Sequence, residues 1–492
     1  MLDWTVRRWS CLLMVSLGLA ACGGGEDDGG IDSAHNDPKW PAPNIVLIQA
    51  SDLSPHDISA YVDGRFPTPN LKRLADAGVR FTQAYTASSA AGPARAGLMT
   101  GRHPSRFGYE YDNLPPEQDQ AQSVGLPTDE VVIARMLKDT GYNTVGIGVW
   151  GLGGMTPDSP RYPVNKGYDD FFGTLAGETA YVDSPDDTIT YVPAVKTSVS
   201  PMRDHNAMIV SGKDARMVPS GGYATDLFAD KAVEAIDRLA GKPFFLSVTF
   251  NAPSVPLQAP AAMVAKVTNI ADPATRVYAA MIMSLDAGVG RILDALDKRG
   301  LAGNTLVIFT ANRGCNGLAE VCACDAGGIG APTLYEGGLK VPLIMRWPAA
   351  LTAGHSYDKA VSTIDLYATI MKAARARKPV GVRLESIDLL PYVRGDKKGA
   401  PRQQMIWLRR PMSALRQGQW KLIEDPDAGQ TRLFDLSVDP FEHTDVAEQN
   451  PALVSQLKAQ LQIGRAFAVD PLWLSRGKVD VDACGTATTV FQ

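Results

Sequence analysis

The sequence predicts an α/β protein with a mostly parallel sheet sandwiched by helices and a small C-terminal α+β lobe. Helix, glycine turn and apolar strand follow one another repeatedly, as in VVIARMLKDTGYNTVGIGVW and KAVEAIDRLAGKPFFLSVTF. The runs FFLSVTF and TLVIFT are apolar without strict alternation, which is typical of parallel strands buried on both faces. After about residue 400, ALRQGQWKLI and TRLFDLS predict an antiparallel hairpin, and ALVSQLKAQLQ predicts a final amphipathic helix.

Composition restricts the class of protein. The chain has 492 residues, of which 45% are hydrophobic and 21% charged, and such a length can bury a large core. The formal net charge is −5, whereas a nucleic-acid-binding protein usually has a basic face. We therefore expect a soluble globular fold with no nucleic-acid partner.

The amino-terminal residues predict export. Arg7 and Arg8 precede the apolar run CLLMVSLGLAA, which is too short to span a bilayer. The run ends in LAAC, which resembles a bacterial lipobox with Cys22 as the lipidated residue. Gly23 is not an inner-membrane retention signal, so the expected product is an outer-membrane-anchored lipoprotein that faces the periplasm or the cell surface. The alternative is an ordinary secretory signal in which Cys22 is incidental.

These patterns divide the chain into four parts. Residues 1–21 are the expected lipoprotein signal peptide, and residues 22–41 form a flexible linker rich in Gly and Asp. Residues 42–399 form the α/β domain, and residues 400–492 form the C-terminal subdomain of antiparallel sheet and helix.

Four cysteines remain after Cys11 and Cys22 are set aside. An even number in an exported chain predicts disulfides, with a metal site as the alternative. The sequence leaves the connectivity open, and the candidates are Cys315, Cys322, Cys324 and Cys484.

Polar residues follow several of the expected strands. In open parallel sheets, ligands bind beyond the carboxyl ends of the strands. Three such ends read QASDLS, FNAPSVP and FTANRG, and a helix begins within SSAAGPARAGLMTGRHP. The first candidate site residues therefore come from these four segments.

Eight motifs in order resemble the type I sulfatases of the alkaline phosphatase superfamily, from Pro43 to about Leu461. They are PNIVLIQASD, TPNLKRLADAGVRFTQAY, GPARAGLMTGRHP, GYDDFFG, FNAPSVPLQAP, YEGGLKVPLIMRWP, STIDLYATI and WKLI…LFDLSVDPFE. The resemblance implies a sulfuric ester hydrolase with three requirements. These are a formylglycine nucleophile, a calcium ion, and Lys and His side chains around the transferred group.

The nucleophile of the family is absent from its position. Formylglycine forms from Cys or Ser in a Cys/Ser-x-Pro-x-Arg motif, and Pro93 and Arg95 place Ala91 there. A methyl group cannot attack sulfur. Ser88 and Ser89 lie three and two positions upstream, respectively, so neither is a convincing substitute. Arg95 is retained, and we expect it to bond carbonyl groups at the helix start.

The metal ligands of the family are also mostly replaced. The first strand usually ends in Asp-Asp and here ends in Ser51-Asp52, while the usual Asp-Asn is Asn312-Arg313. One carboxylate should hold calcium poorly, and Arg313 brings a positive charge to the place of the cation. We expect Asp52 and Arg313 to form a salt bridge in its stead.

The remaining polar groups are lost as well. Gly-Lys-Trp-His-Leu-Gly appears as GVWGLG, which puts Val149 and Gly151 at the Lys and His positions. Ser254 replaces the His of a Pro-His motif. A further Lys position is held by Ala331 or Ile329, depending on a short gap.

The joint losses predict a pseudoenzyme without cofactor, in which neither formylglycine nor calcium is expected. Arg95 and Arg313 suggest that it binds a sulfated or other small anionic ligand. Two alternatives remain: an active sulfuric or phosphoric ester hydrolase with a non-standard nucleophile such as Ser89, and a structural cell-surface protein. A membrane partner is expected through the lipid anchor, and no protein partner is indicated.

Overall fold

The structure is a computed structural model that describes residues 40–62, 65–112, 124–177, 179–182, 188–191, 209–211, 216–218, 221–315, 330–473, 478–483 and 486–491. All of these described residues belong to one compact unit. The expected signal peptide, the lipidation residue Cys22, Ile329 and the cysteines Cys322, Cys324 and Cys484 lie outside the described residues. Among the helices that the structure describes, none has the length and apolar character needed to cross a bilayer.

A ten-stranded sheet forms the centre of the fold, in the order β13-β2-β12-β11-β1-β9-β4-β5-β7-β8. Its middle is parallel, and its members are β11 (Thr305–Ala311), β1 (Asn44–Ala50), β9 (Phe244–Thr249), β4 (Asn143–Val149) and β5 (Asp170–Thr174). Antiparallel pairing occurs toward both edges, where β12 joins β11 and β7 joins β5. The predicted mostly parallel α/β sheet is confirmed.

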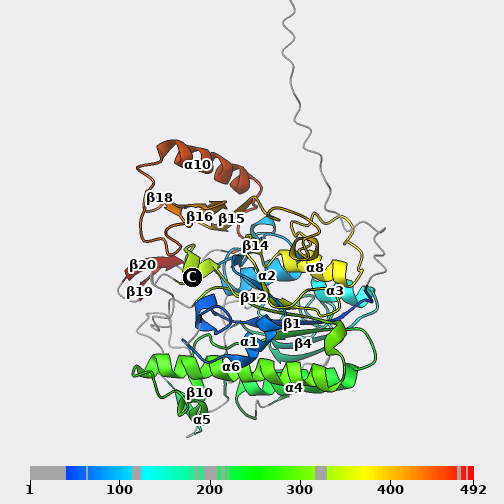
Figure 1. The fold of residues 1–492 in the computed structure, drawn as a ribbon. Helices are drawn as coiled ribbons and strands as arrows, with labels where there is room; N and C mark the ends of the chain where they lie inside the picture. The colour runs from blue at the N-terminus through cyan, green and yellow to red at the C-terminus, as the bar shows by residue number, and fades with distance from the viewer. Residues whose placement is uncertain are drawn as a thin grey trace, which may run out of the picture. The chain divides into compact units, whose positions relative to one another are not determined.

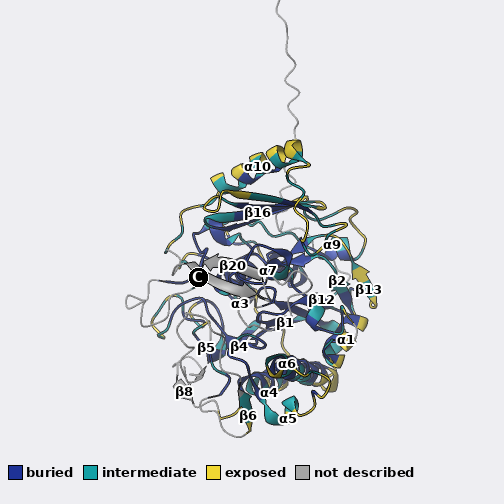
Figure 2. Cartoon of the chain, turned by 90° about the vertical axis from the view of Figure 1, so that its left-hand side faces the viewer, coloured by how far each residue is buried: buried dark blue, intermediate teal, exposed yellow. Residues whose placement is uncertain are grey.

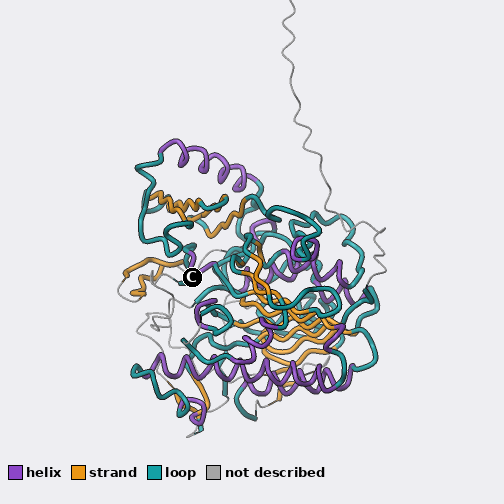
Figure 3. The backbone as a smooth tube through the Cα atoms, in the orientation of Figure 1, coloured by secondary structure: helices purple, strands orange, loops and turns teal. Residues whose placement is uncertain are grey.

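Helices cover both faces of this sheet (Figures 1 and 3). One face carries α4 (Ala224–Leu239) and the long α6 (Pro273–Lys298), which also packs against α1 (Pro69–Asp76). The other face carries α2 (Ala91–Thr100), α3 (Ile133–Asp139) and α8 (Asp365–Ala373). All residues of β9 and β11 are buried, which agrees with their largely apolar sequences.

Shorter elements connect these layers. They are β2 (Val79–Phe81), β3 (Ala84–Tyr85), β6 (Ile189–Tyr191), β7 (Ile209–Ser211), β8 (Arg216–Val218), β10 (Gln258–Pro260), β12 (Leu343–Arg346), β13 (His355–Tyr357), β14 (Val361–Ser362), α5 (Ala261–Val264), α7 (Glu336–Leu339), α9 (Leu390–Val393), and the 3₁₀ turns Pro55–Asp57, Pro104–Arg106 and Ala302–Asn304.

The C-terminal part contains more strands than the sequence predicts. The expected hairpin belongs to a four-stranded antiparallel sheet of β15 (Gln404–Arg409), β16 (Met412–Gln417), β17 (Trp420–Asp425) and β18 (Gln430–Asp435). The amphipathic helix α10 (Pro451–Ala466) buries Leu457 and Leu461 against this sheet and leaves its outer face exposed (Figure 2). The helix is not the final element, because β19 (Lys478–Ala483) and β20 (Thr486–Phe491) follow it.

A buried charge cluster joins the four-stranded sheet to the larger domain. Lys421 of β17 is fully buried, and its Nζ lies 3.0 Å from Glu336 of α7 and 2.8 Å from Glu442. The Trp407 indole of β15 donates a 2.8 Å hydrogen bond to the Thr86 carbonyl. The four-stranded sheet is therefore fixed beside the segment that leads into α2.

Candidate functional site

The carboxyl ends of the central strands meet through backbone hydrogen bonds. Asn312 N–H, just after β11, donates to the Ala50 carbonyl at the end of β1 (3.0 Å). Ser51 N–H in turn donates to the Ala252 carbonyl beyond β9 (3.0 Å). The three strand ends selected from the sequence are thus brought together at one edge of the sheet.

Asp52 and Arg313 form a buried ion pair at this edge. Nε of Arg313 lies 2.5 Å from Oδ1 of Asp52, and Nη2 lies 3.2 Å from Oδ2. The side chains are 1% and 7% exposed, so both oxygens of the carboxylate are used in a pair that water barely reaches. The salt bridge predicted from the sequence is present.

The other oxygen atoms of the expected metal site are also engaged. Oδ1 of Asn312 accepts hydrogen bonds from Asp52 N–H (2.9 Å) and Arg313 N–H (2.7 Å), and this helps to hold Asp52 at φ +58°. Ser51 Oγ donates to the Phe250 carbonyl (2.9 Å), and Ser254 Oγ donates to Oδ2 of Asp52 (2.5 Å).

These residues do not fit calcium. Calcium takes six to eight oxygen ligands with several carboxylates, and the described residues that end these strands offer one carboxylate, Asp52, which a guanidinium already neutralises. Within the described part of the chain, no three His, Cys, Asp or Glu residues are grouped as metal ligands.

Helix α2 begins at Ala91, so a methyl side chain stands at the helix start where the family has its nucleophile. Neither nearby serine is free to replace it. Ser89 is fully buried and donates to the Pro332 carbonyl (3.0 Å), while Ser88 Oγ accepts from Ala90 N–H (3.2 Å). Gly92 N–H, in the first turn, donates to Oδ1 of Asp112 (2.7 Å).

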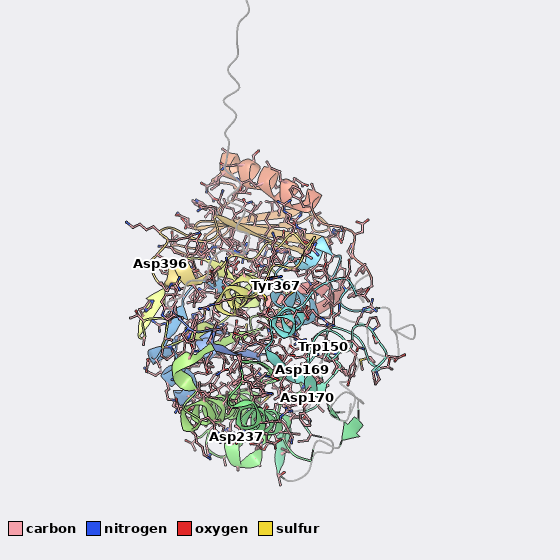
Figure 4. The ribbon with its side chains drawn as sticks, turned by 90° about the vertical axis from the view of Figure 1, so that its right-hand side faces the viewer. Trp150, Asp169, Asp170, Asp237, Tyr367 and Asp396 are labelled. Carbon is pink, nitrogen blue, oxygen red and sulfur yellow. The ribbon has the colours of Figure 1, made fainter. Side chains whose placement is uncertain are left out.

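Arg95 belongs to α2, four residues after Ala91, and its side chain is 3% exposed. Its Nη1 donates to the carbonyl of Trp150 (3.2 Å), which Figure 4 labels just beyond β4. Its Nε has no hydrogen-bond partner among the described residues. The side chain borders a cavity of about 10 Å³ together with Gln49 and Thr249, enough for one water molecule. Burial lowers the pKa of Arg95.

The other positions carried over from the family contribute no charge. Val149 is 3% exposed, and Gly151 adopts φ +61° against the Arg95 guanidinium. Ser254 is half-buried, and Ala331 is fully buried with its N–H donating to the Cys315 carbonyl (2.8 Å). Cys315 is disulfide-bonded.

The structure adds three polar residues that sequence reasoning missed. One is Asp112, which holds the Gly92 N–H. Arg409 of β15 is 2% exposed, and its Nη1 has no hydrogen-bond partner among the described residues. Burial lowers its pKa to about 10, with Asp112 opposing and Arg313 reinforcing that shift. Asn251 follows β9, is 4% exposed, and leaves both atoms of its amide unpartnered in the described structure.

No sequence signal pointed to Arg409 or Asp112, because neither belongs to a quoted motif. Asn251 lies within FNAPSVP, three positions before Ser254, but the family motif gives it no role. Among the described residues, Arg95, Arg313 and Arg409 interact electrostatically with Asp52 and Asp112, and Glu110 also acts on Arg409. Among the described residues, the start of α2 offers no nucleophile.

Comparisons with known proteins agree with this architecture. Residues 43–376 match the Sulfatase family, and residues 331–466 match the family described as N-sulphoglucosamine sulphohydrolase, C-terminal. The chain is 31% identical over 366 residues to the uncharacterized sulfatase YdeN of Escherichia coli, covering 69% of this chain and 59% of YdeN. It is 30% identical to human arylsulfatase A, covering 89% of this chain and 91% of that enzyme.

Solved structures are similar over the same region. The crystal structure of Ps i-CgsB has a TM-score of 0.76 and 28% identity, covering 88% of this chain and 95% of that protein. The same protein has been solved in complex with k-i-k-neocarrahexaose. Its fold, the order of its strand-end loops and these matches together show that the chain belongs to the sulfatase family.

Proposed function

We propose that this protein is a pseudoenzyme of the sulfatase family, which binds a sulfated or other anionic ligand without hydrolysing it. The observation that carries the proposal is the Asp52–Arg313 ion pair, because it puts a side-chain cation where the family uses calcium. Ala91 at the start of α2 supports the same conclusion, since its methyl group cannot become formylglycine.

Unpartnered buried groups support ligand binding. Buried polar atoms in folded proteins are nearly always hydrogen-bonded, and exceptions call for a water molecule, an ion or a ligand. Arg409 Nη1 and the Asn251 amide are such exceptions near the helix start and the strand ends. A sulfate group supplies acceptor oxygens, and guanidinium groups bind such oxyanions well.

The sequence supports placing this activity outside the cytoplasm. The basic n-region, the short apolar run and the LAAC motif lead to an exported lipoprotein anchored through Cys22 to the outer membrane. Multiple acyl chains would hold it firmly, since one chain binds a membrane only marginally. Labelling of cells with a palmitate analogue would test this, and loss of the label in Cys22→Ala is the expected result.

Turnover is the first experiment. Purified protein should release no product from p-nitrophenyl sulfate or p-nitrophenyl phosphate, with calcium or manganese supplied. Human arylsulfatase A serves as the positive control. Metal-dependent turnover that disappears in Ser89→Ala would replace the proposal with a hydrolase that uses a non-standard nucleophile.

Binding is the second experiment. Calorimetry with a sulfated monosaccharide should give heat with the wild-type protein and at least tenfold weaker binding with Arg409→Gln. The matched control is Arg394→Gln, which removes a partly exposed arginine paired with Asp396 (2.7 Å) and should leave binding unchanged. Absence of heat with the wild-type protein would favour a structural role, with which the burial of Arg95, Asp52 and Arg313 agrees.

A further inference from the structure

Asp112 lies at the place where an external anion would bind to the start of α2. Its Oδ1 accepts the 2.7 Å hydrogen bond from Gly92 N–H, in the first turn of a ten-residue helix. A helix start favours a negative charge through its free N–H groups and its dipole. Asp112 is therefore bound as an anionic ligand would be, but from within the chain.

Two arginines with unused donors act on this carboxylate. Asp112 is among the charges that raise the pKa of Arg95, and it is the first charge that acts on Arg409. The two arginines are 3% and 2% exposed, and Nε of Arg95 and Nη1 of Arg409 remain without hydrogen-bond partners in the described structure. Asp112 thus acts on both cations, together with Asp52 at Arg95 and Glu110 at Arg409, while an N–H group of each arginine stays without a hydrogen-bond partner in the described structure.

Contacts from the C-terminal part hold Asp112 in this position. The Trp473 indole donates to the Asp112 carbonyl (3.1 Å) and packs edge-on against Tyr109, with ring centroids 4.9 Å apart. The Tyr111 hydroxyl donates to the Arg410 carbonyl, 2.7 Å away in the turn after β15. Asp112 is half-buried, whereas Arg95 and Arg409 are almost completely buried, so solvent reaches Asp112 more readily than it reaches either arginine.

We infer that Asp112 is a tethered competitor, which occupies the anion position at the start of α2 and must leave before a sulfate group can bind Arg95 and Arg409. The inference rests on the proposed function and adds its regulation. In the variant Asp112→Asn, the side-chain amide would keep an acceptor for Gly92 N–H while the charge is removed. This variant should therefore open the site without unfolding the helix start.

The test is a calorimetric titration with inorganic sulfate at constant ionic strength. We expect Asp112→Asn to bind sulfate at least tenfold more tightly than the wild-type protein, and the added change Arg409→Gln to reverse the gain. The matched control is Asp272→Asn, which removes a carboxylate from the start of α6 (2.7 Å from Thr275 N) away from this arginine cluster and should change nothing. An unchanged sulfate affinity in Asp112→Asn would overturn the inference.

A second measurement uses the wild-type protein and needs no folded variant. Hydrogen–deuterium exchange should become faster at residues 108–112 when sulfate is added, relative to chloride of equal ionic strength. Slower or unchanged exchange there, at a sulfate concentration that slows exchange at the start of α2, would mean binding without displacement and would also overturn the inference. Repeating the titration with a sulfated monosaccharide distinguishes a free ion from a saccharide-borne sulfate.

Different results would refute the proposed function and the role of Asp112. Turnover of a sulfate ester by the wild-type protein would refute the proposed function whatever Asp112→Asn does. Binding of the sulfated monosaccharide with equal affinity to the wild-type protein and Asp112→Asn would leave the proposed function in place and remove the role of Asp112.

Discussion

A β-carbon added to Gly151 would lie 2.2 Å from Nη1 of Arg95. The family has a histidine at the position of Gly151, so any side chain restored there must first displace a guanidinium that is fixed to the Trp150 carbonyl. The loss of the histidine and the present position of Arg95 are therefore coupled, and reversing one substitution alone would not restore an active site.

Gly151→Ala should reveal this coupling as a loss of stability. Alanine at φ +61° costs about 1–2 kcal/mol, and displacing Arg95 from its hydrogen bond adds about 1–3 kcal/mol. The control is Gly221→Ala, which has φ +65° and open space around its β-carbon, so it measures the backbone cost alone. Urea unfolding of the two variants compares them, and equal losses would contradict the clash with Arg95.

Removing only the guanidinium of the buried ion pair should lower the free energy of unfolding more than removing both charges. Arg313→Met leaves Asp52 charged at 1% exposure, for which we expect a loss of about 3–5 kcal/mol in the free energy of unfolding. The double variant Asp52→Asn/Arg313→Met leaves no buried charge and should be more stable than Arg313→Met. Arg394→Met, at a partly exposed pair, should cost less than about 1 kcal/mol. A double variant less stable than the single one would contradict the pairing.

Rebuilding the carboxylates should restore a metal response. The variant Ser51→Asp/Asn312→Asp/Arg313→Asn places oxygen ligands around Asp52, so we expect calcium to bind and raise its melting temperature. Calcium at a hundred times its dissociation constant would add about 2.7 kcal/mol. The wild-type protein should melt at the same temperature in calcium and in a chelator. A calcium-dependent rise in the wild-type protein would show that Arg313 does not replace the metal.

Asp57 should make stability depend on pH. Complete burial raises its pKa from 3.8 to about 6, despite a hydrogen bond from Tyr278 (2.9 Å) and an ion pair with Arg65 (3.4 Å). Between these values the native state holds more protons than the unfolded chain, so the contribution to stability is present below pH 3.8 and is lost as the pH rises through 6. The loss amounts to about 3 kcal/mol at most.

Comparing the wild-type protein with Asp57→Asn at several pH values isolates this contribution. The stability of the wild-type protein relative to Asp57→Asn should fall from about pH 4 to about pH 6.5. Asp272 provides a control of opposite sign, because hydrogen bonds from Thr275 lower its pKa. The wild-type protein should gain stability relative to Asp272→Asn as the pH rises. A flat difference for Asp57 would mean that its carboxyl group is solvated in the native state.

The central sheet could be predicted because strands buried on both faces are apolar at most positions, which is visible in the local sequence. Strands such as β9 and β11 are apolar at nearly every position, and glycine separates them from the preceding helices. The sequence does not predict β15, although QMIWLR is largely apolar, because the turn Arg410-Pro411 that joins it to β16 lacks the Asn-Gly or Asp-Gly pair typical of a two-residue hairpin. The sequence does not predict the hairpin β19–β20 either, because VDVDA and TATTV are short and largely polar.

The site could be predicted only as far as its residues lie in motifs. The Asp52–Arg313 pair can be predicted from charge. Arg313 stands at a position where the family has a metal-binding residue, and Asp52 is the carboxylate that remains at the end of another strand. Arg409 and Asp112 interact across nearly three hundred positions, and a single sequence carries no record of such an interaction. Their place in the site depends on how the four-stranded sheet packs, which hydrophobic patterns do not specify.

The bond from Trp473 to Asp112 joins residues 361 positions apart. During synthesis the start of α2, the strand ends and Asp112 leave the ribosome long before Trp473 does. The central sheet can form by then, whereas this polar pocket is incomplete until residues 469–473 have packed against residues 105–112. The site is therefore among the last parts of the protein to be assembled, and a chain released early would have the fold without it.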